Sequence, residues 1–116
     1  MGSIFYGDMD HAIHIDDAVL AHLKVVIITK LRRQESFSLS WQHPEGETPG
    51  RSTIWLHQAI PLRFVFDSPE SAPLNPEWVT AMANSVNSTG GITVLSKDML
   101  SAEEAAAASE AASQDG

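Results

Sequence analysis

The stretch 18–33 constrains the fold most, because it combines the period of a buried helical face with the length of a long helix. Its apolar side chains recur at steps of three and four residues, as they do in an amphipathic helix. They are Val19, Leu20, Leu23, Val26, Ile27 and Leu31. Asp16 or Asp17 lies just before them, where a carboxylate accepts hydrogen bonds from the first amides of a helix. The stretch therefore predicts a helix of roughly four turns at about 3.6 residues per turn.

A strand is the competing interpretation of this stretch. Residues 25–28 are four β-branched residues in a row, and such residues lower helix propensity. The cap, the length and the basic last turn nevertheless favour a helix. Val25 and Ile28 also widen the apolar face beyond one side. We therefore expect a sheet to cover one side of the helix and a second helix or another subunit to cover the other.

Strand patterns lie on both sides of this helix. Before it, 3–6 and 12–15 flank a turn-forming Gly-Asp-Met-Asp segment, which predicts a β-hairpin. After it, 36–41 alternates between serines and large apolar residues, the pattern of a half-buried strand. The segments 52–57 and 62–66 repeat this alternation. We expect the last three segments to form a meander of antiparallel strands.

The remaining elements complete an α+β domain. Asn75, followed by a proline, begins a second predicted helix that ends near Gly90, and 92–95 makes a short last strand. Alanine, serine and glutamate dominate 97–116, so we expect an acidic tail that is disordered or a frayed helix. The prediction is a single α+β domain over 1–96. Its mostly antiparallel sheet follows the order β-β-α-β-β-β-α-β, with the helices packed on one face.

The composition fits one soluble domain and excludes several function classes. Of 116 residues, 43% are hydrophobic and 19% are charged, as in ordinary globular proteins. The chain has no cysteine, which excludes disulfides, thiolate zinc sites and cysteine nucleophiles and suits a reducing cytoplasm. No secretory signal and no apolar run of about 20 residues is present, so we expect a cytoplasmic protein without a membrane segment. The formal net charge of -8 disfavours nonspecific binding to nucleic acid.

Positive charge is concentrated in one place, the last turn of the first predicted helix, which holds Lys30, Arg32 and Arg33. Such residues stabilise a helix through its dipole, which is a purely structural explanation. The alternative is recognition of a phosphate or carboxylate, for which arginine supplies a planar donor fork. In that case we expect Arg51 and Ser36 to converge on the basic turn and complete an anion or partner site.

Trp55 is the second candidate for a binding surface. It faces away from its apolar neighbours in the strand 52–57, so we expect it to be exposed and to contact a partner. In a meander, Thr53, Arg63 and Val65 would share its face and form a mixed aromatic and cationic surface.

Neither the other tryptophans nor the histidines indicate chemistry. We expect Trp41 and Trp78 to pack in the core. His11 and His14 are three residues apart and would face opposite sides of a strand, which does not suit a metal site. We expect His22 on the helix surface, and no serine, histidine and carboxylate pattern indicates a triad. The sequence therefore predicts no catalytic residue, no metal ligand and no cofactor.

Three segments carry a family resemblance: 25–41 (VVIITKLRRQESFSLSW), 50–62 (GRSTIWLHQAIPL) and 83–92 (ANSVNSTGGI). They resemble a family of small uncharacterised actinobacterial proteins, and the likeness covers roughly 1–96. Members often carry the label of ATP-dependent DNA ligase, which implies a lysine nucleophile within Lys-x-Asp-Gly. None of the lysines in this sequence begins that motif, and no Gly-rich phosphate loop is present. Ligation is therefore rejected, although the label is compatible with a DNA-related setting.

These observations favour a non-catalytic binding module that binds a protein partner or a second copy of itself through the basic helix end and Trp55. The second hypothesis is a small nucleic-acid or nucleotide binder that uses Lys30, Arg32, Arg33 and Arg51. The third is an enzyme of unrecognised type. Salt separates the first two, because nucleic-acid affinity falls steeply with added salt and an apolar protein interface does not.

Overall fold

The computed structural model describes residues 2–7, 12–71 and 73–99. Its elements are β1 (Gly2–Tyr6), β2 (Ile13–Ile15), α1 (Asp17–Arg32), β3 (Phe37–Gln42), β4 (Arg51–Leu56), β5 (Leu62–Phe66), α2 (Pro76–Thr89), β6 (Gly91–Val94) and the 3-10 turn η1 (Ser96–Asp98). The α+β class and the order β-β-α-β-β-β-α-β are confirmed. Most of the predicted tail, from residue 100 onward, lies outside the described residues.

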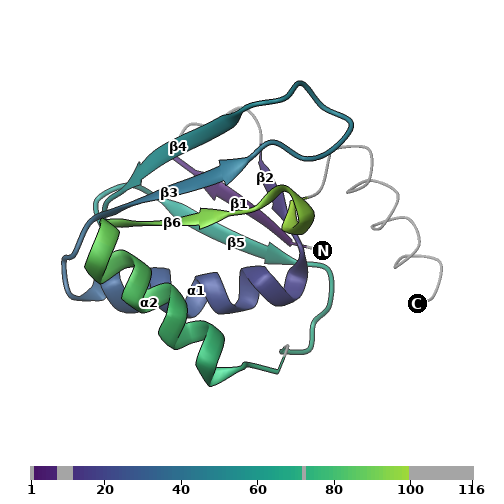
Figure 1. The fold of residues 1–116 in the computed structure, drawn as a ribbon. Helices are drawn as coiled ribbons and strands as arrows, with labels where there is room; N and C mark the ends of the chain where they lie inside the picture. The colour runs from purple at the N-terminus through teal and green to yellow at the C-terminus, as the bar shows by residue number, and fades with distance from the viewer. Residues whose placement is uncertain (1, 8–11, 72, 100–116) are drawn as a thin grey trace.

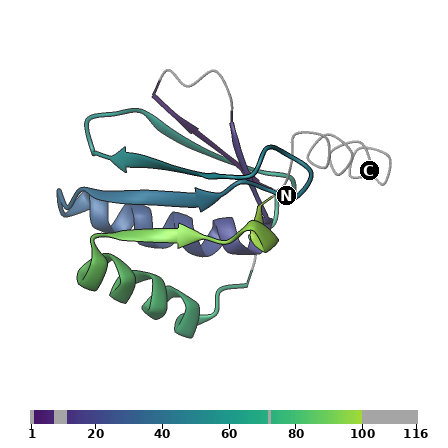
Figure 2. The same cartoon turned by 45° about the horizontal axis from the view of Figure 1, so that its top comes forward.

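The strands form two three-stranded sheets rather than one. One sheet has the order β2-β1-β5 and the other β4-β3-β6. All pairings are antiparallel except that of β6 with β3. Both helices lie on the same side of the strands (Figure 1). α2 packs against α1 and lies beside β6 (Figure 2).

The predicted meander is wrong in its last step, because β5 pairs with β1 and not with β4. Leu62 lies opposite Tyr6, and Phe66 lies opposite Gly2, so all of β5 is used in this pairing. The alternation of apolar and polar residues in β5 is the same whichever strand lies next to it. The pattern therefore identified the strand but not its neighbour.

The Tyr6 side chain joins the two sheets at the edge of β4. Its hydroxyl donates to the Trp55 carbonyl and accepts from the His57 N–H at 3.2 Å. β4 is an edge strand in the described part of the chain, and backbone groups on a sheet edge need other partners. The Tyr6 hydroxyl thus supplies two of the hydrogen bonds that a neighbouring strand would otherwise supply at this edge.

The core lies where α1 meets the inner faces of both sheets. α1 begins at Asp16, whose carboxylate accepts from the N–H groups of Ala18 and Val19 at 3.2 and 3.4 Å. The fully buried large side chains come from β1, β2, α1, β3 and β4, and they form one cluster. They are Phe37, Ile4, Ile15, Leu20, Leu23, Ile27, Leu39 and Leu56.

Two side chains lie where the sequence did not predict them. His22 is buried rather than on the helix surface, and its Nε2 accepts the Asn75 N–H at 2.8 Å, which ties α1 to the first turn of α2. Trp78 is 46% exposed rather than in the core, although its ring lies 4.7 Å from that of His22. α2 buries only Val86, so its first turn lies at the periphery of the core. Trp41 packs partly buried against the core, as expected.

Candidate interaction surface

Lys30, the first residue of the predicted basic cluster, is buried and already paired. Its side chain is 8% exposed, and Nζ donates to Asn87 Oδ1 at 2.7 Å. Nζ also lies 3.6 Å from a carboxylate oxygen of Glu35. Because Asn87 belongs to α2, these contacts hold α2 against the end of α1. Lys30 therefore contributes to the contact between the two helices and is not open at the surface.

The rest of the predicted basic corner is not brought together. Arg32 and Arg33 are exposed at the end of α1, near Ser36 and the start of β3. Arg51 is paired with Gln42 at the opposite end of β3. At about 3.3 Å per residue, the length of β3 separates Arg51 from the basic turn by about 17 Å. The expected convergence of Arg51 on Arg32 and Arg33 is therefore wrong.

Trp55 is exposed, as the alternation predicted, with 58% of its surface accessible. It lies on the outer face of β4, where its neighbour Thr53 shares a hydrogen bond of 2.8 Å with Ser40. The expected surface that joins Trp55 to Arg63 is divided, because β5 belongs to the other sheet. There the Arg63 guanidinium lies 4.8 Å from the centre of the Phe5 ring. Trp55 therefore stands on a largely polar face.

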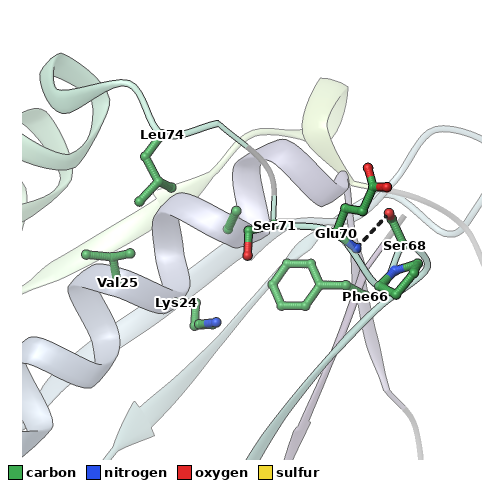
Figure 3. Close-up of a pocket in the computed structure, with 9 residues that line it drawn as sticks. Lys24, Val25, Phe66, Ser68, Glu70, Ser71 and Leu74 are labelled. Carbon is green, nitrogen blue, oxygen red and sulfur yellow. Dashed lines mark hydrogen bonds between the residues drawn. The ribbon is translucent and has the colours of Figure 1, made fainter.

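Two depressions lie end to end between α1 and β5, and we call them together the α1–β5 groove. At one end, Lys24 and Val25 of α1 face Phe66, and the chain after β5 forms the rim (Figure 3). At the other end, Ile28, Leu31 and Arg32 of α1 face the first half of β5. This end is also lined by Gln58, Ile60, Pro61, Leu62 and Phe64.

The floor of the groove is apolar and its cations lie on α1. Ile28 is 40% exposed, and Phe64 and Phe66 are only half-buried. Lys24 Nζ lies 5.6 Å from the centre of the Phe66 ring, within range of a cation–π interaction. Figure 3 shows Lys24 beside the Phe66 ring, while the Glu70 carboxylate points away from both. The widened apolar face of α1 was the sequence signal for this surface.

The free edge of β5 borders the groove. The Gly7 N–H donates to the Pro61 carbonyl at 2.9 Å, so the backbone groups of Pro61 face β1. The direction of these groups alternates along an antiparallel strand. The N–H and C=O groups of Leu62, Phe64 and Phe66 therefore point away from β1. Within the described ranges, no strand is paired with this edge.

Two histidines form hydrogen bonds with serine side chains of neighbouring strands. His43 Nε2 lies 2.8 Å from Ser52 Oγ, and its Nδ1 lies 3.0 Å from the Thr48 carbonyl, so the ring closes the β3–β4 loop. His14 Nδ1 lies 2.9 Å from Ser3 Oγ across the β1–β2 pair. In the part of the chain that the structure describes, no group of three histidines or acids could hold a metal ion. No helix there is long and apolar enough to cross a membrane.

Comparison with known proteins identifies a family but no function. No curated protein and no solved structure matches the chain. The sequence profile of a family described as a domain of unknown function, DUF7882, matches residues 1–97, which is most of the chain. The match includes all six strands and both helices and ends within η1. The chain therefore belongs to the DUF7882 family.

Proposed function

We propose that this domain is a non-catalytic protein-interaction module and that the α1–β5 groove is its binding surface. The observation that carries the proposal is the combination of an apolar floor with a strand edge that is not paired with any strand of the described residues. A strand edge offers main-chain hydrogen bonds to another chain, and neighbouring apolar pockets hold the side chains of that chain. Natural proteins usually protect such edges, so an open one beside apolar side chains is typical of an interface.

The energetics of Ile28 support a partner. At 40% exposure it leaves part of a large aliphatic side chain in water, next to the half-buried ring of Phe64. Covering apolar surface stabilises a complex by about 25 cal/mol per Å². Fully covering an aliphatic or aromatic side chain is worth about 1.5 to 3 kcal/mol before the entropy of association is subtracted.

The alternative of a nucleic-acid or nucleotide binder has less support. It requires Lys30, Arg32, Arg33 and Arg51 to act on one anion, but Lys30 is paired with Asn87 and Arg51 lies at the far end of β3. The resemblance to proteins labelled as DNA ligases adds no residue to this site. Only Arg32 and Arg33 remain together for a phosphate, in a chain with a net charge of -8.

Capture by the immobilised protein tests the proposed function. Tagged wild type, Ile28→Glu and the control Thr80→Glu, which alters an exposed position on α2, are compared in lysate that also contains an untagged copy of this chain. Folding of each bait is first verified by circular dichroism. We expect wild type and Thr80→Glu to retain the same proteins and Ile28→Glu to lose them. Identical capture by all three baits would show that the groove is not the binding surface.

A further inference from the structure

The occupant of the groove is an inference that rests on the proposed function. We propose that it is a second copy of this chain, and that two β5 strands pair antiparallel about a two-fold axis. A two-fold interface uses the same surface on both copies, so a single patch has to complement itself. The α1–β5 groove meets this condition in its backbone, its apolar side chains and its charges.

The backbone of β5 suits pairing with itself. Its free N–H and C=O groups belong to Leu62, Phe64 and Phe66, the first, middle and last residues of the strand. An antiparallel pair centred on Phe64 places this residue opposite the partner's Phe64. It also places Leu62 opposite the partner's Phe66. Every outward-facing backbone group of the strand then finds a partner, and the two β2-β1-β5 sheets become one continuous sheet.

The side chains of these residues all lie on the face that packs toward α1, where they adjoin the core. Pairing of β5 with its copy therefore extends the apolar layer from one protomer into the next. The added strand would cover Ile28, the exposed aliphatic residue in the middle of the groove. The polar side of β5, which carries Arg63, stays on the outer face, where the guanidinium lies over Phe5.

The charges at the two ends of the groove are complementary. Arg32 lies at the Leu62 end. At the Phe66 end, Glu70 lies on the rim and Lys24 lies on α1. Antiparallel pairing brings the Arg32 end of each copy to the partner's Glu70. Parallel pairing would instead place the partner's Arg32 beside Arg32, which opposes association.

Sedimentation velocity over a concentration series tests the inference through a charge exchange. The variants are Arg32→Glu, Glu70→Arg and the double variant. The control is Arg33→Glu, which makes the same charge change beside the groove. We expect wild type and Arg33→Glu to dimerise with similar Kd. Each single variant should raise Kd by about tenfold, because an exposed ion pair contributes little but occurs twice about the two-fold axis, and each copy becomes repulsive. The double variant should recover most of the loss.

Two results would overturn the dimer. The first is wild type that stays monomeric at every concentration. The second is a double variant whose loss of dimer affinity equals the sum of the losses in the two single variants. Neither result removes the proposed function by itself. A monomeric protein that still captures other proteins, and loses them in Ile28→Glu, retains the groove as a binding surface with a different occupant. A monomeric protein whose capture is unaffected by Ile28→Glu refutes both.

Discussion

Replacement of Tyr6 by phenylalanine tests the contact that joins the two sheets. The change removes one oxygen and keeps the ring, which is 8% exposed and packs in the core cluster. It leaves the Trp55 carbonyl and the His57 N–H without the hydroxyl. A net contribution of about 0.5 to 1.5 kcal/mol for each hydrogen bond gives a loss of about 2 kcal/mol in the free energy of unfolding. At about 4 °C per kcal/mol, Tm should fall by roughly 8 °C.

Urea denaturation and differential scanning calorimetry measure this loss. The matched control is Thr53→Val, which removes a hydroxyl of similar size from the exposed pair with Ser40 and should change the free energy of unfolding by less than about 0.5 kcal/mol. Equal stability of Tyr6→Phe and wild type would refute the account. It would mean that solvent satisfies the edge of β4 equally well and that the phenol does not hold the sheets together.

Two further predictions concern packing around α2 and β6. Asn87→Ala removes the acceptor of the buried Lys30 ammonium and should lower the free energy of unfolding, measured by urea titration, by about 1 to 2 kcal/mol. Asn87→Asp keeps an acceptor and should not lower it. An equal loss in both variants would contradict the role of this contact. Gly91→Ala would place a Cβ 2.8 Å from the Ser38 carbonyl oxygen, which forces β6 away from β3. The free energy of unfolding should fall by about 1 to 3 kcal/mol. Thr93→Ala, on the exposed face of β6, is the control. A Gly91→Ala protein with wild-type Tm would mean that β6 has room to shift.

Local signals predicted much of this fold. The Asp16 cap and the apolar period of 18–33 specified α1, because both act within a few residues of chain. The Gly90 C-cap has a φ of 82°, the left-handed conformation that glycine adopts without strain. Strand partners were harder to predict. The alternation in β5 fits β1 and β4 equally, and the strand that pairs with it, β1, is far away in sequence.

The helical period of 18–33 places His22 and Lys30 on the buried side of α1, although polar residues are usually expected at the surface. His22 follows Val19 by three residues and precedes Val26 by four, so it lies on the buried arc of α1. Lys30 lies on the same arc, four residues after Val26. What a sequence cannot show is that Asn75 and α2 supply the partners that make burial of these polar groups tolerable.

The sequence indicated one wall of the α1–β5 groove but not the other. Val25 and Ile28 indicated that α1 has a second apolar side and that another helix or subunit could cover it. The other wall is formed by β5, which borders the groove as the edge strand of its sheet. Its place at the edge is a property of strand order, which a local sequence pattern does not show. The basic turn, in contrast, is where the sequence concentrates positive charge. Its lysine serves the contact between helices, and Arg32 alone lines the α1–β5 groove.

Amide hydrogen exchange along β5, measured at high protein concentration and after dilution, tests the central claim most directly. If two copies pair through β5, the amides of Leu62, Phe64 and Phe66 exchange slowly in concentrated protein and faster after dilution. The amides of Arg63 and Val65 face β1 and should stay protected at both concentrations. This alternation of responses is the predicted result. Exchange of the Phe64 amide that is fast and independent of concentration would contradict pairing of two copies at this edge.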